Sequence, residues 1–252
     1  MNRSSKLWAL CALLIGILGW LLIPSSAIPI LAYHQISEEA DVYSVSPQEF
    51  EKQMRYLVEN GYQAVSLQEM FDSYSGRFTL PAKPVVITFD DGYVDNYTAA
   101  LPIMERYGMR ATVFIIINAV GQPDYLSWQQ IEEMSSRHTE IGSHTMNHVA
   151  LSEITAAERL LEITASKALL EQRLGKPVEF LAYPYGSFDV ATEDSLRQAG
   201  YRGACAGVPG LNFSSDNPYT LKRINVPRPR FGLLEFRLRL LRAQLVSKLR
   251  LL

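Results

Sequence analysis

The chain reads Val85-Val86-Ile87-Thr88-Phe89-Asp90-Asp91-Gly92-Tyr93 about a third of the way along its 252 residues. The apolar and β-branched run 85–89 predicts a buried strand, and Gly92 predicts that the backbone turns soon after it. Carboxylates at the end of a buried strand need a partner. A turn would aim both into one pocket, where a metal ion can take one as a ligand and leave the other free to accept a proton. The alternative is that Asp90 and Asp91 cap a helix beginning near Asn96.

Outward from this strand, the sequence alternates between strand and helix patterns. Helix starts are indicated where Ser or Thr precedes Glu or Gln by three residues, at Ser46, Ser66, Ser127 and Thr155. Strands are expected at 28–33, 64–65, 85–89, 111–117, 140–143, 180–182, 203–206 and 221–226. This alternation predicts an α/β fold with a largely parallel sheet, and an α/β barrel of this length forms one domain.

Polar residues with catalytic potential follow several of these strands. They are His34, Asp90, Asp91, His144 and Tyr185. Barrels and open α/β folds place their chemistry at this end of the strands. If the chain is helical from His144 to His148, both imidazoles project from one side. Two histidines and one carboxylate can bind a metal ion and leave coordination positions open, although a surface histidine pair would look the same in sequence.

The segments 88–92 and 144–148 together resemble the polysaccharide deacetylase family, the NodB-type domain of carbohydrate esterase family 4, over residues 28–227. Segments 30–34 and 181–186 resemble the branch that contains extracellular poly-N-acetylglucosamine deacetylases of biofilm systems. The resemblance implies a distorted (β/α) barrel with fewer than eight complete repeats. It also implies hydrolysis of N-acetyl groups from an amino-sugar polymer.

The resemblance also implies roles for individual residues. The positions that match the family's metal ligands are Asp91, His144 and His148, a set that suits zinc. Asp90 matches the general base. The turn that matches the substrate-binding segment is Pro184, Tyr185 and Gly186, in which the Tyr185 backbone N–H matches the group that faces the oxyanion.

Two departures from the family pattern concern the catalytic groups. Ala182 stands where the family has an arginine that braces the base, and Arg223 is a candidate substitute. No histidine follows His148, so the usual late acid is missing. His34 is the candidate acid because the first and last strands of a closed barrel are neighbours. The alternative is a structural His34 bonded to a backbone carbonyl; His138 is expected to be solvated.

The charge distribution separates the body from the two ends of the chain. Residues 28–227 contain 15 Lys or Arg and 25 Asp or Glu, which argues against nucleic acid as a partner. The uncharged run 7–23 follows Arg3 and Lys6 and precedes small residues at 24–27. Residues 1–27 are therefore expected to be a signal peptide or an uncleaved membrane anchor, with the body outside the cytoplasm. Because Cys11 lies in this run, a disulfide framework is not expected.

The tail, residues 228–252, contains seven basic residues and one acid. Leucines recur at steps of three or four, at 234, 238, 241, 245, 249 and 252, and predict a basic amphipathic helix. Such a helix either packs on the barrel or contacts an anionic membrane surface.

These features favour a metal-dependent N-deacetylase acting on an N-acetylglucosamine-containing polysaccharide. The alternatives are a non-catalytic carbohydrate-binding relative, and an amidase acting on small non-sugar amides. The sequence leaves open the polymer, the native metal and the oligomeric state.

Overall fold

The computed structural model describes Trp8, residues 26–137 and residues 139–249. The expected signal or anchor segment lies almost wholly outside the described residues. Within them, no helix is both long and apolar enough to span a bilayer. The strands are β1 (Ile30–Tyr33), β2 (Gln63–Ala64), β3 (Pro84–Phe89), β4 (Thr112–Ile115), β5 (Glu140–Ser143), β6 (Phe180–Ala182), β7 (Gly203–Pro209) and β8 (Leu221–Asn225).

The strands close into a distorted barrel. Seven of the eight described strands form the ring β1-β8-β7-β6-β5-β4-β3, which closes because β1 also pairs with β3. All the pairings are parallel, and β2 adds a short outer strand beside the start of β3. First and last strands are neighbours, with Leu31 opposite Ile224. The expected barrel of fewer than eight complete repeats is confirmed.

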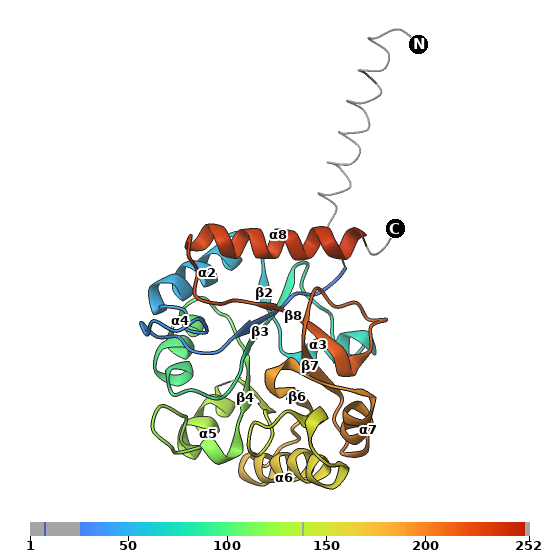
Figure 1. Ribbon diagram of the computed structural model, residues 1–252. Coiled ribbons are helices and arrows are strands. Elements are labelled where there is room, and N and C mark those ends of the chain that lie inside the picture. The colour runs from blue at the N-terminus through green and yellow to red at the C-terminus, as the bar shows by residue number, and fades with distance from the viewer. Residues whose placement is uncertain (1–7, 9–25, 138, 250–252) are drawn as a thin grey trace.

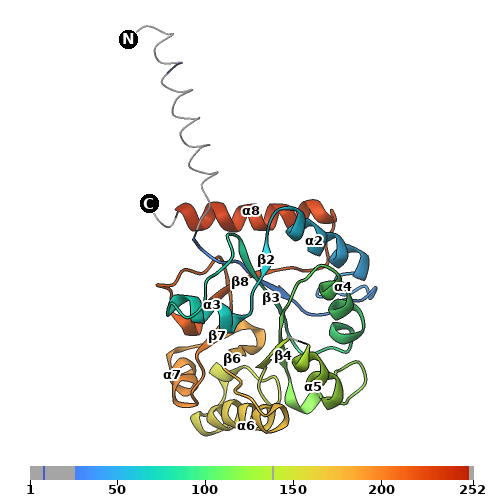
Figure 2. The same ribbon diagram turned by 180° about the vertical axis from the view of Figure 1, so that it is seen from behind.

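Helices surround the ring (Figures 1 and 2). They are α2 (Pro47–Glu59), α3 (Leu67–Tyr74), α4 (Leu101–Arg106), α5 (Trp128–Ser136), α6 (Ala156–Leu174), α7 (Val190–Gln198) and α8 (Leu233–Leu249). Reciprocal capping boxes open α3, α5 and α6, as expected. At α2 the structure shows one half of the expected box, in which Ser46 accepts from the Glu49 backbone N–H.

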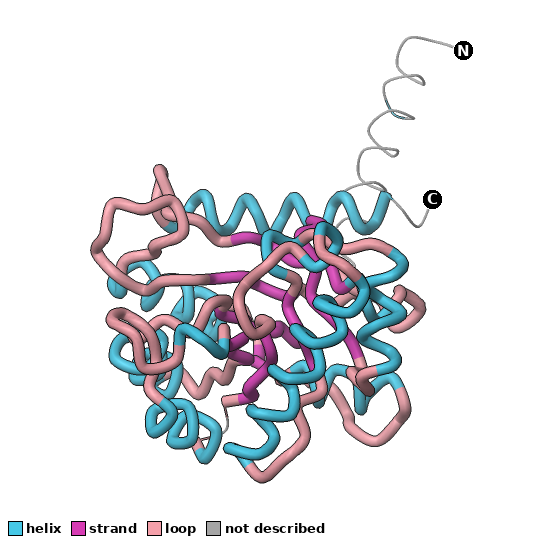
Figure 3. The backbone as a smooth tube through the Cα atoms, turned by 60° about the horizontal axis from the view of Figure 1, so that its bottom comes forward, coloured by secondary structure: helices cyan, strands magenta, loops and turns pink. Residues whose placement is uncertain are grey.

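Alternate side chains of the strands pack into two buried clusters. The smaller cluster includes Ile30, Val86 and Phe180, and the larger includes their sequence neighbours Leu31 and Ile87. Since strand neighbours point to opposite faces, the smaller cluster fills the barrel and the larger lies beneath the helices. Burial on both faces explains the continuous apolar runs that predicted these strands. Figure 3 shows the strands enclosed by helices.

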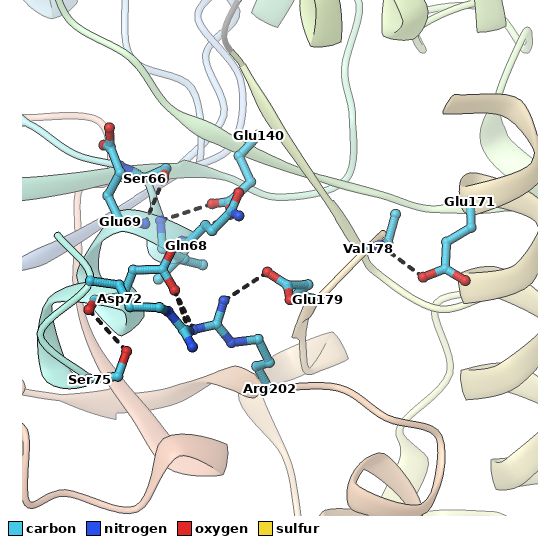
Figure 4. Close-up of polar contacts among 12 residues, drawn as sticks. Ser66, Gln68, Glu69, Asp72, Ser75, Glu140, Glu171, Val178, Glu179 and Arg202 are labelled. Carbon is cyan, nitrogen blue, oxygen red and sulfur yellow. Dashed lines mark hydrogen bonds and ion pairs between the residues drawn. The ribbon is translucent and has the colours of Figure 1, made fainter. Parts of the chain in front are cut away.

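The partly buried carboxyl group of Glu140 joins the start of β5 to α3 (Figure 4). Glu140 accepts hydrogen bonds from the backbone N–H groups of Leu67 and Gln68, at 2.9 and 3.0 Å, and from the Thr112 hydroxyl. Burial raises the pKa of Glu140 to about 7 although these bonds favour its charged form. This contact holds α3 against the end of the barrel opposite the candidate site.

Two expectations about helices need correction. The helix expected from Asn96 begins as a π-helical turn over Asn96–Ala100 before α4. The tail helix begins at Leu233 rather than 228. Its packing on the barrel is confirmed for Phe236 and Leu240, which are 2% and 4% exposed.

Candidate active site

The two aspartates after β3 face one cavity because the backbone reverses there. Asp91 and Gly92 have φ values of 74° and 77°, a left-handed conformation that turns the chain directly after the strand. The Asp90 N–H still donates to Tyr33 O across β1, at 2.9 Å. The capping interpretation of Asp90 and Asp91 is wrong, since the residue preceding the π-helical turn is Asp95 and its side chain makes no capping bond.

The two histidines after β5 lie on a loop rather than on a helix. Thr145 and His148 have φ values of 70° and 56°, so the chain is not helical there, although the two imidazoles still come together. The loop is held instead by Glu162 of α6, whose Oε2 accepts from the N–H groups of Met146 and Asn147 at 2.9 and 3.0 Å. The loop brings the rings of His144 and His148 to a centroid separation of 4.8 Å.

Asp91, His144 and His148 form a cluster that fits a metal ion. Nε2 of His144 and Nε2 of His148 lie 3.3 and 3.4 Å from Asp91 Oδ1. Among the described residues, that oxygen is buried without a hydrogen-bond partner of suitable geometry. Nδ1 of His144 lies 2.7 Å from Ala182 O; as the donor to that carbonyl, it leaves the Nε2 lone pair facing the cluster. The donor set suits zinc and leaves coordination positions open.

The electrostatics of the cluster favour a cation. Burial alone would lower the pKa of His144, but the carboxylates of Asp91 and Asp90 outweigh it and raise that pKa. Burial lowers the pKa of His148. A site that stabilises positive charge on His144 has the negative potential that attracts a metal ion.

Asp90 is paired with an arginine from the last strand. Nη1 and Nη2 of Arg223 lie 2.7 and 2.8 Å from the two carboxylate oxygens of Asp90, and both side chains are buried. Burial alone would raise the pKa of Asp90, but the guanidinium, with His144 and His34, holds it well below its usual range. Arg223 therefore occupies the bracing place that Ala182 leaves vacant.

His34 opens onto the same cavity. Its Nε2 lies 4.0 Å from Asp90 Oδ2, and its ring packs on Tyr43 with centroids 4.8 Å apart. The buried Asn96 amide donates to His34 O at 2.8 Å. Among the described residues, no backbone carbonyl accepts a hydrogen bond from the His34 ring, which disfavours the structural alternative. His138 lies outside the described residues.

The turn after β6 forms another wall of the cavity. Tyr185 has φ 59° and is 74% exposed, and its ring lies 4.7 Å from that of His148. Gly186 packs so closely on Gly207 that a Cβ at Gly186 would lie 2.4 Å from the Gly207 Cα. A larger residue at either position would move this wall away from the histidines.

The cavity has a volume of about 460 Å³. It brings together every sequence-predicted site residue except Pro184, which is buried and does not line it. The lining residues that sequence reasoning did not single out include Glu39, Asp41, Tyr43, Tyr93 and Asn225. Only Tyr93 had a local signal, since it directly follows Gly92 at the end of the β3 segment. Asn225 ends β8, and Glu39, Asp41 and Tyr43 come from the loop after β1, whose path the sequence pattern does not determine.

The chain belongs to the polysaccharide deacetylase family. The polysaccharide deacetylase family profile matches residues 78–204. YxkH of Bacillus subtilis, a protein assigned to the polysaccharide deacetylases, is 34% identical, over 79% of this chain and 71% of its own. The poly-β-1,6-N-acetyl-D-glucosamine N-deacetylase of Staphylococcus epidermidis is 29% identical, over 77% of this chain and 72% of its own.

Solved structures of deacetylases have the same fold. The deacetylase PplD of Streptococcus pyogenes, solved with acetate, superposes with a TM-score of 0.77 at 27% identity, covering 84% of this chain and 98% of its own. IcaB of Ammonifex degensii superposes with a TM-score of 0.75 at 29% identity, covering 80% of this chain and 92% of its own.

Proposed function

We propose that the protein is a metal-dependent hydrolase that removes N-acetyl groups from an N-acetylglucosamine-containing polysaccharide and releases acetate. The observation that carries the proposal is the convergence of three groups in one cavity: the Asp91–His144–His148 cluster, the Asp90–Arg223 pair and His34. Each group supplies one requirement of amide hydrolysis.

The ligands of the metal are Asp91, His144 and His148. A divalent ion bound there, most simply zinc, would lower the pKa of a coordinated water to about 7 and polarise the amide carbonyl. Asp90 accepts the proton of the attacking water. Arg223 keeps Asp90 ionised and fixes both of its oxygens, so the base is held ready in one orientation.

The departing amine needs a proton, and His34 supplies it. The His34 ring lines the same cavity as the metal ligands, and its Nε2 lies 4.0 Å from Asp90 Oδ2, so it can reach a group bound there. The Tyr185 backbone N–H stabilises the developing oxyanion from the turn beside His148.

The substrate is a polymer with N-acetylated amino sugars, in keeping with the names of the relatives. Aromatic side chains at the mouth, Tyr43 and Tyr185, give sugar rings flat apolar faces to pack on, and Glu39 and Asp41 add acidic groups. The free amines that the reaction creates are cationic, so this rim suits a partly deacetylated chain.

The body acts outside the cytoplasm. Support comes from the order of Arg3 and Lys6, the uncharged run 7–23 and the small residues before Ile28. A polysaccharide substrate of the cell envelope or matrix lies in the same compartment.

The test is acetate release by the metal-loaded protein across a panel of poly-β-1,6-N-acetylglucosamine, chitin oligomers and peptidoglycan. Release from an amino-sugar polymer supports the proposal. Metal binding without acetate release would favour the non-catalytic carbohydrate-binding alternative. Activity confined to small non-sugar amides would favour the amidase.

A further inference from the structure

The outward face of α8 is apolar and basic at once. Leu234, Leu238 and Leu241 are 56%, 54% and 50% exposed, at spacings of four and three that place them on one face of the helix. Thirteen large apolar side chains of the described residues are exposed, and five of them lie within 231–246. No other described stretch of that length contains more than two. Leucines therefore lie on two faces of α8, and only one of these faces packs on the barrel.

Cationic side chains flank the exposed leucines. Arg237 and Arg242 are exposed on the same side of the helix, and Arg237 lies over the Tyr56 ring, 5.5 Å from its centroid. The acid of the helix, Glu235, is paired with Arg239 at 2.7 Å. The tail is strongly basic whereas residues 28–227 are acidic, so positive charge is concentrated on this side of the molecule.

The described body begins beside this helix. Ile28 is fixed by two backbone hydrogen bonds with Asn212, of 2.8 and 3.0 Å. Figures 1, 2 and 3 all show the start of the described body next to the C-terminal end of α8. In the sequence, the uncharged run 7–23 directly precedes this point. A bilayer that holds this run would lie close to α8.

We propose that the outward face of α8 docks on an anionic lipid surface. Leu234, Leu238 and Leu241 enter the boundary between headgroups and acyl chains, and Arg237 and Arg242 contact lipid phosphates. A second copy of this chain fits the face less well. A two-fold interface along the leucines would bring the arginines of both copies to one patch, where like charges repel.

The test measures the polarity around position 238 in the full chain. Leu238→Cys is introduced in a Cys11→Ser background and labelled with an environment-sensitive fluorophore; Cys205 is buried and stays unlabelled. The protein is reconstituted in vesicles of phosphatidylcholine alone or with about one third phosphatidylglycerol. Leu161→Cys on α6, where Leu161 is 65% exposed, is the matched control.

The expected result is a shift to shorter emission wavelength at position 238 in the anionic vesicles, a smaller shift in neutral vesicles, and none at position 161. The double variant Arg237→Gln/Arg242→Gln should reduce the docking constant about 30-fold, since each cation near an anionic surface contributes about fivefold. Arg173→Gln on α6 should leave it unchanged. Point variants are preferred to deletion of 231–252, because deletion would also expose the packing surface of Phe236 and Leu240.

Three results would overturn the proposal. Equal emission at positions 238 and 161 in both vesicles would show that α8 does not reach the bilayer. Equal shifts in neutral and anionic vesicles would remove the role of the arginines. A shift that needs no lipid and grows with protein concentration would assign the face to a second copy. Acetate release from a soluble N-acetylglucosamine oligomer should be the same in all these variants. This measurement distinguishes failure of the docking inference from failure of the proposed function.

Discussion

Arg223 from the last strand forms two hydrogen bonds with Asp90, which directly follows the third strand; they are 2.7 and 2.8 Å long and lie in a buried part of the cavity. The two residues are 133 positions apart in the sequence. They meet because barrel closure places β8 beside β1, and β1 beside β3. The pair replaces the brace that the family pattern puts at Ala182.

Arg223→Met should destabilise the fold and reduce turnover. It leaves the Asp90 carboxylate buried without its cationic partner, which typically costs about 3–5 kcal/mol of unfolding free energy. Arg223→Lys keeps the charge but loses the paired hydrogen bonds, so it should reduce stability and turnover less than Arg223→Met does. Urea denaturation together with kcat measures both effects. A methionine variant as stable and active as the wild type would rule out the bracing role.

Asp90→Asn should retain the metal and lose turnover by about 10²–10⁴-fold, because an amide cannot accept the water's proton. Metal content and kcat are measured on the same preparation. Asp91→Asn is the matched control and should lose metal. If Asp90→Asn loses the metal while Asp91→Asn keeps it, the two roles are reversed.

His34→Ala should keep the fold and metal but lose deacetylation. The loss should be large for the amide, whose amine departs only when protonated, and small for an activated acetate ester, whose leaving group needs no acid. The ratio of the two rates is the measurement, and His138→Ala is the control. Near-wild-type turnover on the polymer would remove His34 from the mechanism and strengthen the case for a different acid.

Glu140 should make stability depend on pH. Burial raises the pKa of Glu140 to about 7, above its unfolded value, so the native state binds this proton more tightly than the unfolded chain does. Proton binding at Glu140 stabilises the native state fully below pH 4.5, and this stabilisation is lost as pH rises through about 7. The free energy of unfolding should fall by about 3 kcal/mol over that range. Urea denaturation from pH 4.5 to 8 checks it. Glu140→Gln should lack this part of the decrease, and an unchanged profile would contradict the assignment.

The sequence predicted the barrel because the strands of the ring form buried apolar runs and four helices begin with capping signals, at Ser46, Ser66, Ser127 and Thr155. It also predicted which residues would gather, since residues after parallel strands share one end of a barrel. The backbone path from His144 to His148 could not be predicted, because Glu162 of α6 binds the backbone N–H of Met146 and holds a loop in which Thr145 and His148 have positive φ. The sequence could not predict which leucines of α8 pack on the barrel and which are exposed, because leucine occurs on both faces of that helix.

Deacetylation by this protein is proposed to depend on a metal ion held by the Asp91–His144–His148 cluster. The most direct test is a parallel measurement of bound metal, acetate and new primary amines on an N-acetylglucosamine polymer, before and after chelation and after zinc is restored. Equal amounts of acetate and amine are predicted only when metal is bound, and neither metal nor product is predicted for His144→Ala/His148→Ala. Full zinc occupancy in that double variant, or a zinc-loaded wild type that releases no acetate from any polymer, would contradict the metal's role.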